Sequence, residues 1–139
     1  MIPRISQAPQ VSELTTEFLN TLRQNGFTGD ISSTYADRLT MATDNSIYQL
    51  LPQAVIFPRS TADVTIVARL VDEPRFHSLS LTPRGGGTGT NGQALTEGIV
   101  VDLSRYMKRI IEINPEQRWV KVEAGVIKDE LNLFLKPYG

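Results

Sequence analysis

Apolar residues recur at helical spacing in three stretches of the chain and predict amphipathic helices over residues 12–25, 60–71 and 127–135. In the second stretch, Ser60 and Asp63 have the spacing of a capping box, which marks the start of a helix. Glycine or proline is expected just beyond a helix end, because neither continues a helix well. The residues in that position are Gly26, Glu73-Pro74 and Gly139.

Short apolar or alternating runs predict strands over residues 54–57, 78–82, 99–103, 109–113 and 118–124. The first two flank the second helix and form a βαβ unit, whose crossover is expected to be right-handed. In the last run Val120 and Val122 alternate with charged residues, so one face is expected to be buried and the other wet. We expect these strands to be neighbours in one sheet. Residues 28–51 have weak periodicity and are predicted to be irregular, with a helical turn near residues 35–39.

The composition suits one globular domain, and the predicted mixture of helices and strands puts it in the α+β class. The 139 residues are 40% hydrophobic and 21% charged, enough for one core but not for separate cofactor and substrate domains. Complex catalysis therefore requires more protein than this chain. A net charge of −1 argues against nucleic acid as a partner, because phosphate binding needs a basic surface.

The chain has no cysteine, which excludes disulfides, thiolate metal sites and iron–sulfur ligands from this stretch. No window approaches the roughly 18 to 20 consecutive apolar residues of a membrane span, and the first residues lack an apolar signal core. We therefore expect a soluble, cytoplasmic protein without a metal site in this stretch.

The segment PRGGGTGTNG, residues 83–92, requires a chemical explanation. Five glycines in the eight residues 85–92 lose much backbone entropy on ordering, so a folded domain retains them where backbone approaches something closely or takes positive φ. Successive N–H groups without side chains form a nest for an anion such as phosphate. Thr88, Thr90 and Asn91 add side-chain donors.

Three other interpretations of this loop are weaker. A flexible linker rarely lies between two short apolar strands. A Walker A loop ends in Gly-Lys-Ser/Thr, which is absent here. Residues 87–92 match GxGxxG, yet only residues 93–97 separate them from Gly98 and the next strand, so the helix that a Rossmann site needs does not fit.

The motifs PRGGGTGTNGQAL, GIVVDLSRYMKRIIEI and VKVEAGV together resemble the first FAD-binding subdomain of the vanillyl-alcohol oxidase and p-cresol methylhydroxylase (PCMH) superfamily. The upstream TDNSIYQLLPQAVIFPRSTADV is similar to FAD-linked dehydrogenases of D-2-hydroxy acids, the D-lactate and D-2-hydroxyglutarate group. The resemblance covers residues 37–139. It implies a helical and irregular extension over residues 1–50 and the first part of a PCMH-type FAD-binding domain over residues 51–139.

The resemblance also implies a set of cofactor contacts. Backbone amides over residues 84–90 are expected to wrap the FAD pyrophosphate, with Pro58 near the adenine end. The implied contact residues are Pro58, Arg84, Gly85, Gly86, Gly87, Thr88, Gly89, Thr90, Asn91 and Gln93, of which Thr88, Asn91 and Gln93 are side-chain neighbours. The Arg84 guanidinium either supplies charge to the pyrophosphate or is a solvated strand end, and both possibilities stay open at this point.

Members of the superfamily that bind flavin covalently from this loop have histidine where this chain has Thr88, so noncovalent FAD is expected. His77 lies upstream of a strand and is predicted to be a surface residue. Asp102 is predicted to cap the turn at residues 103–105, and no residue is assigned a catalytic role. For TDNSIY, residues 43–48, we favour a role in turn formation over one in function.

The leading hypothesis is the FAD-binding part of an oxidoreductase that, by resemblance, moves a hydride from a D-2-hydroxy acid to flavin. Three alternatives stay open: the flavin subunit of a molybdenum hydroxylase, a flavin reductase of cell-wall synthesis, and a noncatalytic nucleotide- or phosphate-binding module. An iron–sulfur cluster is possible only beyond residue 139. The chain alone is expected to be inactive, to need the remainder of its polypeptide, and to self-associate through exposed apolar faces.

Overall fold

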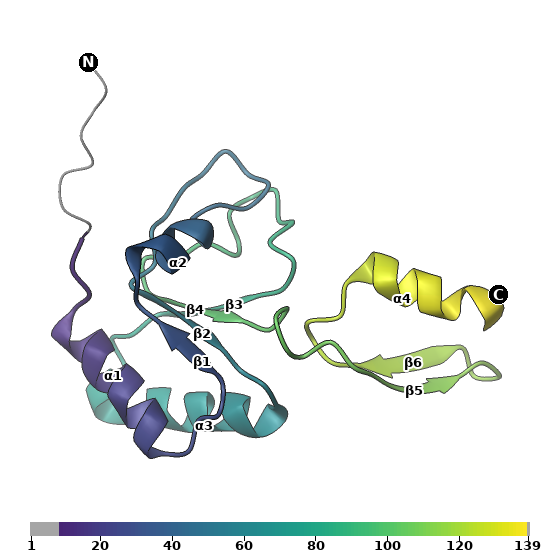
Figure 1. Cartoon of the computed structure of the whole chain (residues 1–139), viewed down its shortest axis with the longest axis horizontal. Helices are drawn as coiled ribbons and strands as arrows, with labels where there is room; N and C mark the ends of the chain where they lie inside the picture. The colour runs from purple at the N-terminus through teal and green to yellow at the C-terminus, as the bar shows by residue number, and fades with distance from the viewer. Residues whose placement is uncertain (1–8, 139) are drawn as a thin grey trace.

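The computed structural model describes residues 9–138, which form a four-stranded sheet with helices on both faces and a smaller C-terminal lobe (Figure 1). The strand order is β1-β2-β4-β3, with β1 antiparallel to β2 and the other pairs parallel. The strands are β1 (Asp30–Ser32), β2 (Ala54–Phe57), β3 (Leu81–Arg84) and β4 (Ile99–Asp102). The predicted α+β class is confirmed.

The two central strands form because their sequences are continuous apolar runs. Every residue of β2 and β4 is buried, as expected for parallel strands that are covered on both faces. Helices α1 (Glu13–Gln24) and α3 (Thr61–Val71) cover one face (Figure 1). Phe18 of α1 meets Phe76 edge to face, with ring centroids 5.1 Å apart. Segments on both sides of residue 50 thus share one core.

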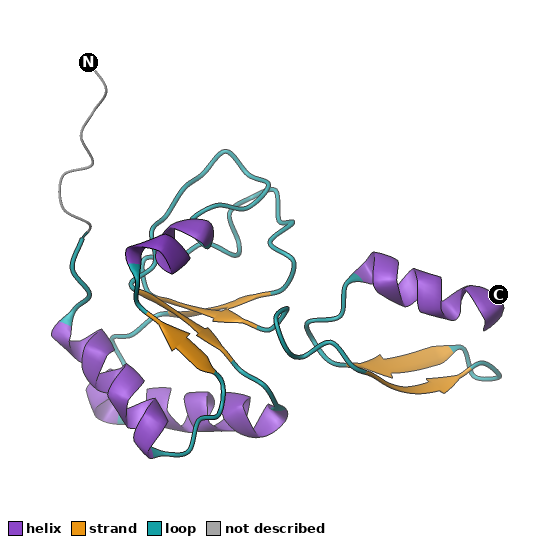
Figure 2. Cartoon of the chain, in the orientation of Figure 1, coloured by secondary structure: helices purple, strands orange, loops and turns teal. Residues whose placement is uncertain are grey.

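The opposite face of the sheet is covered mainly by irregular chain. Besides the short helix α2 (Tyr35–Thr40), two long loops lie over this side (Figure 2). A small cluster of Val55, Phe57 and Val100 is buried there. Loops therefore cover most of this face. Binding residues are commonly found on loops that a rigid sheet holds in place.

The βαβ unit exists, but β4 lies between its two strands. Strand β3 also begins at Leu81, three residues later than Ser78, where we predicted its start. The reason is Pro74, which opens a 3-10 helix, η1 (Pro74–Phe76), and the amide of Leu79 then closes a turn onto the carbonyl of Phe76 at 2.9 Å. Pro83 is tolerated because β3 is an edge strand.

The expectation of a single sheet was wrong. Strands β5 (Ile110–Asn114) and β6 (Trp119–Val122) form a separate two-stranded hairpin, which lies with α4 (Lys128–Leu135) and η2 (Lys136–Tyr138) in the C-terminal lobe (Figure 1). Asp102 caps a turn directly after β4, at the point where the chain leaves the main sheet. No helix in residues 9–138 is long and apolar enough to cross a bilayer. Gly139 lies outside the described residues.

Asp63 connects the N-terminal segment to the start of α3. The side chain of Ser60 accepts from the amide of Asp63, which completes half of the predicted capping box. The carboxylate, 1% exposed, accepts instead from the backbone amides of Thr28 and Arg59, each at 2.8 Å. One buried acid thus holds two loops, and its removal leaves both amides without their partner.

Asp63→Ala should lower the free energy of unfolding by about 2 to 3 kcal/mol, because charge-assisted hydrogen bonds are lost and buried donors are left unpaired. Glu116→Ala, at an exposed turn position, is the matched control and should change it by less than about 0.5 kcal/mol. Chemical denaturation followed by circular dichroism measures both. Equal midpoints for the two variants would contradict this role of Asp63.

Candidate functional site

The carboxyl ends of β2, β3 and β4 lie at one edge of the main sheet because these strands are parallel. Pro58 follows β2, the glycine-rich loop follows β3, and the turn after Asp102 follows β4. Open sheets commonly bind ligands at this edge. The geometry therefore brings the predicted residue Pro58 to the same edge as the start of the loop.

The glycines of the loop fall into two groups. Gly87 and Gly92 have φ of +65° and +75°, a region that other residues rarely adopt. A Cβ atom at Gly87 would also lie 2.3 Å from Arg84 Nη2, so the guanidinium would have to move for any other residue to fit. A Cβ atom at Gly85 would meet nothing within 4 Å, and one at Gly86 would meet only Thr88 Cγ2, at 3.6 Å. Open space therefore borders the first two glycines.

The side chains of the loop are similarly divided. Thr88, Thr90 and Asn91 are exposed. Gln93 turns back, since its Oε1 accepts from the Asn91 amide at 3.0 Å and its Cδ would lie 2.7 Å from a Cβ atom at Gly89. Gln93 thus shapes the loop from within. No helix follows the loop, because residues 93–97 contain only a turn at 93–94, irregular chain and a bend, so the helix of a Rossmann site is not present there.

Arg84 points to a second loop. Its Nη2 donates to the carbonyl of Thr43 at 2.8 Å. In that segment Asp44 accepts from the amide of Ser46 at 2.8 Å, and Ser46 Oγ accepts from the amide of Tyr48 at 3.1 Å. Hydrogen bonding from Ser46, aided by the charge of Arg84, lowers the pKa of Asp44. The predicted role of TDNSIY in turn formation is confirmed.

A hollow of about 290 Å³ separates the two loops. It is lined by Tyr48, Gln49, Leu50, Asn91, Gly92 and Leu95. The ring of Tyr48 comes within 3.1 Å of the position that a Cβ atom at Gly92 would take. The segment 43–50 therefore borders the glycine-rich loop, although the two are about forty positions apart in sequence.

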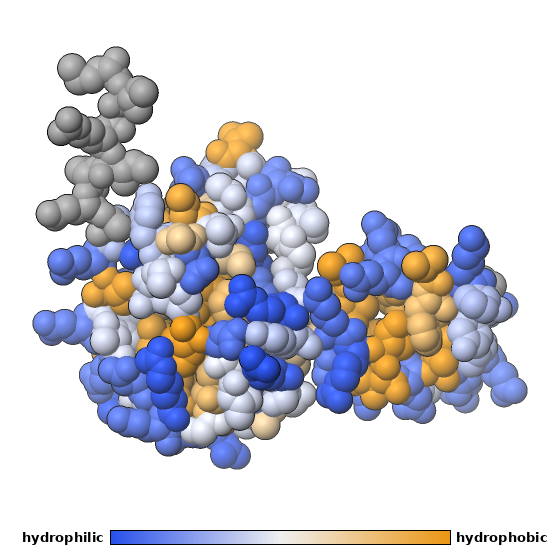
Figure 3. All heavy atoms as spheres, in the orientation of Figure 1, coloured by the Kyte–Doolittle hydropathy of each residue, from blue (hydrophilic) through white to orange (hydrophobic). Residues whose placement is uncertain are grey.

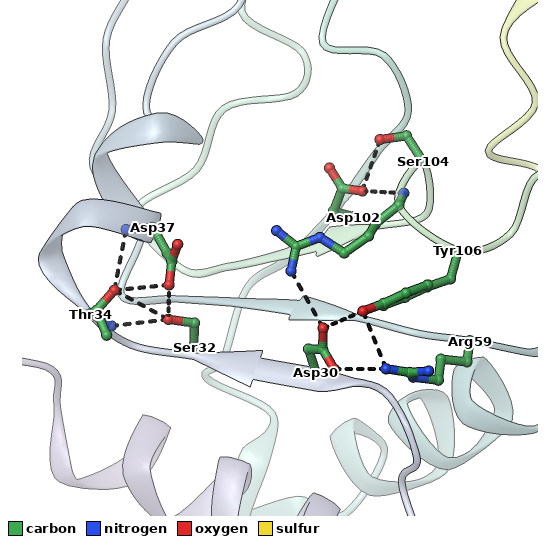
Figure 4. A network of polar contacts seen from close by, with 9 residues as sticks. Asp30, Ser32, Thr34, Asp37, Arg59, Asp102, Ser104 and Tyr106 are labelled. Carbon is green, nitrogen blue, oxygen red and sulfur yellow. Dashed lines mark hydrogen bonds and ion pairs between the residues drawn. The ribbon is translucent and has the colours of Figure 1, made fainter.

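A charged cluster at the same edge was missed at the level of sequence (Figure 4). Asp30 accepts from the Tyr106 hydroxyl, from Arg59 at 3.1 Å and from Arg105 at 3.4 Å. The hydrogen bond from Tyr106, followed by that from Arg59, lowers the pKa of Asp30, and the hydrogen bond to Asp30 raises the pKa of Tyr106. The Arg105 guanidinium lies 3.5 Å from the ring centroid of Phe57. No local motif could reveal these contacts, because they join residues far apart in sequence.

Asp102 and His77 lie as the sequence predicts, Asp102 in a turn cap and His77 at the surface. Asp102 accepts from the Ser104 hydroxyl at 2.9 Å and the Arg105 amide at 3.0 Å, which confirms the predicted cap (Figure 4). His77 is exposed before β3, at the edge opposite the loop, with Nε2 2.8 Å from the Asp72 carbonyl oxygen. The described residues hold no group of three or more acidic or histidine side chains suited to a metal ion.

Comparison with known proteins decides the family. The pattern of the FAD binding domain family matches residues 52–139. This chain belongs to that FAD binding domain family. It is 70% identical over 139 residues to a D-2-hydroxyglutarate dehydrogenase of Escherichia coli (strain K12), an alignment that covers 100% of this chain and 14% of that relative. The chain thus spans only a small part of the relative's length.

Solved structures show the same fold. An alkyldihydroxyacetonephosphate synthase superposes with a TM-score of 0.79 at 18% identity, over 100% of this chain and 27% of that one. A p-cresol methylhydroxylase with substrate bound gives a TM-score of 0.71 at 16% identity, over 91% and 25%. The fold that the resemblance implies, that of the first subdomain of a PCMH-type FAD-binding domain, is therefore confirmed.

Proposed function

We propose that this FAD binding domain grips the pyrophosphate of FAD within a flavin-dependent dehydrogenase of D-2-hydroxy acids. The observation that carries the proposal is the open space beside Gly85 and Gly86 at the carboxyl edge of the sheet. Backbone amides without side chains at this position suit a diphosphate, which needs close approach and several donors. The identity of 70% to a D-2-hydroxyglutarate dehydrogenase supports the substrate class.

The residues have distinct roles in this proposal. The amides over residues 84–90 bind the pyrophosphate, and Thr88 and Asn91 add side-chain donors. Gln93 acts indirectly by holding the loop, since its Oε1 already accepts from the amide of Asn91. Pro58 is buried under the protein's own atoms, and we propose that it supports the adenine end of the site from within.

When bound, FAD would supply the hydride-accepting redox chemistry. This chain binds and orients the cofactor, and the remainder of the polypeptide provides the substrate site. We assign no proton transfer to the described residues. A cytoplasmic location is part of the same proposal.

The apolar surface of the C-terminal lobe supports the proposal that the functional protein is longer than this chain. Apolar side chains gather between its hairpin and α4 (Figure 3). The exposed apolar residues of this lobe are Ile111, Trp119, Ile127, Leu133, Phe134 and Tyr138. A surface of this kind is typical of an interface, and we propose that the remainder of the polypeptide covers it.

Gly86→Asp should remove FAD from the full-length protein, because a side chain fills the space of the pyrophosphate and a carboxylate repels it. Gly86→Asn is the matched control for size without charge and should retain more flavin than Gly86→Asp. The flavin-to-protein ratio after purification, with circular dichroism as a check on folding, measures the effect. Near-normal flavin in folded Gly86→Asp protein would show that the loop does not hold the phosphates.

The full-length protein should release all of its flavin on acid precipitation, because Thr88 offers no imidazole for a covalent bond to the ring. The yellow colour is then found in the supernatant, where absorbance measures it. Colour that stays with the precipitated polypeptide would refute noncovalent binding.

The 139-residue chain expressed alone should bind FAD more weakly than the full-length protein by about 3 kcal/mol or more, roughly a hundredfold, and should not turn over D-lactate or D-2-hydroxyglutarate. It should also self-associate, and Leu133→Ser should reduce this, whereas Ile47→Ser in the other lobe should not. Calorimetry, a turnover assay and ultracentrifugation test these points. Turnover by the isolated chain would show that it needs no further domain.

A further inference from the structure

Arg84 has two contacts that together define its position. Its Nη2 donates to the Thr43 carbonyl at 2.8 Å, which joins β3 to the segment 43–50. The guanidinium also fills the space beside Gly87, where a Cβ atom would lie 2.3 Å from Nη2, 2.7 Å from Cζ and 3.0 Å from Nε. Gly87 also has φ of +65°, so both its backbone conformation and the adjacent guanidinium favour glycine at this position. The Arg84 side chain therefore contacts both the glycine-rich loop and the segment 43–50.

The surroundings of Arg84 contain a second unusual feature. Arg84 Nη1 and Asp44 Oδ2 are both buried, and neither has a hydrogen-bond partner among the described residues. They belong to groups of opposite charge, and Asp44 directly follows the residue whose carbonyl Arg84 binds. A buried charge is costly unless an opposite charge or donor compensates it. Arg84 and Asp44 form no ion pair within 4 Å in residues 9–138, but the charge of Arg84 contributes to the lowered pKa of Asp44, so the two groups interact through space.

We infer that Arg84 is a positioning residue, which fixes the segment 43–50 against the glycine-rich loop so that this segment forms a second wall of the cofactor site. The inference rests on the proposed function. The guanidinium does this through its planar shape, which binds a carbonyl at one nitrogen while its face packs on Gly87. In this inference the charge of Arg84 acts on Asp44, whose pKa it helps to lower, and not on the phosphates.

A second contact between the loops agrees with this role. Tyr48 lies against Gly92, where φ is +75° and a Cβ atom would lie 3.1 Å from the ring. The segment 43–50 therefore contacts the glycine-rich loop at two points, at Arg84 through the Thr43 carbonyl and at Gly92 through Tyr48. A loop held at two points loses less entropy when a ligand orders it, which favours binding.

The test is FAD titration of full-length apoprotein carrying R84K, R84M or D44N, at several salt concentrations. R84M and R84K should both weaken FAD binding by about tenfold or more, because lysine keeps the charge but lacks the planar group. The salt dependence of the dissociation constant should stay as in the wild type, since no phosphate contact is lost. D44N should weaken binding in the same direction, and R69M, at an exposed position of α3, is the control that should not change it.

The outcomes distinguish a failure of this inference from a failure of the proposed function. Wild-type affinity in R84K together with a loss and a flatter salt dependence in R84M would show that Arg84 acts as a charge on the phosphates. Wild-type affinity in all three variants would also overturn the inference. A wild-type protein that ignores FAD would overturn the proposed function itself. If R84M does not fold, R84K and D44N decide the question.

Discussion

The structure depends on the parallel pairing of β4 with both β2 and β3. This pairing buries two continuous apolar strands between α1 and α3 on one face and loops on the other. It also forces three strand ends to one edge of the sheet. This edge therefore carries the glycine-rich loop, Pro58 and the capped turn after Asp102. Their proximity follows from the parallel strands and needs no direct contact between them.

The glycines show how one loop meets two demands. The conformation of the protein itself favours glycine at three positions: Gly87 and Gly92 have positive φ, and side chains of Arg84, Gln93 and Tyr48 lie close to the Cβ positions of Gly87, Gly89 and Gly92. Gly85 and Gly86 have no such neighbours beyond Thr88, so internal packing does not explain them. The absence of side chains at these two positions instead suits the close approach of a phosphate. The sequence of the glycine-rich loop alone does not distinguish glycines favoured by the protein's own conformation from glycines that suit the approach of a phosphate.

Features set by local chemistry were predictable from the sequence. The cap at Ser60, the stop at Gly26 and the apolar run of residues 54–57 each act over a few neighbouring residues. Alternation predicted β5 and β6 but not their separation from the main sheet, because alternation does not specify which strands pair. The start of β3 was misplaced because the turn made by η1 extends further along the chain than Pro74 alone indicates.

The site was predictable only in part for a similar reason. The composition of residues 85–92 identified the loop, since a folded chain rarely keeps so many glycines unless backbone must approach a neighbour closely or adopt positive φ. The contact of Arg84 with segment 43–50 was hidden, because its acceptor is a backbone carbonyl, which any residue carries. The Asp30 cluster was hidden because its partners come from segments that only the folded sheet brings together.

Hydrogen–deuterium exchange of the full-length protein, with and without FAD, tests the central claim most directly. If the glycine-rich loop holds the pyrophosphate and segment 43–50 forms the second wall, FAD should slow exchange over residues 84–92 and over residues 43–50. Exchange in α1 and α3, on the other face of the sheet, should change much less. Protection by FAD that leaves residues 84–92 unaffected would contradict the account.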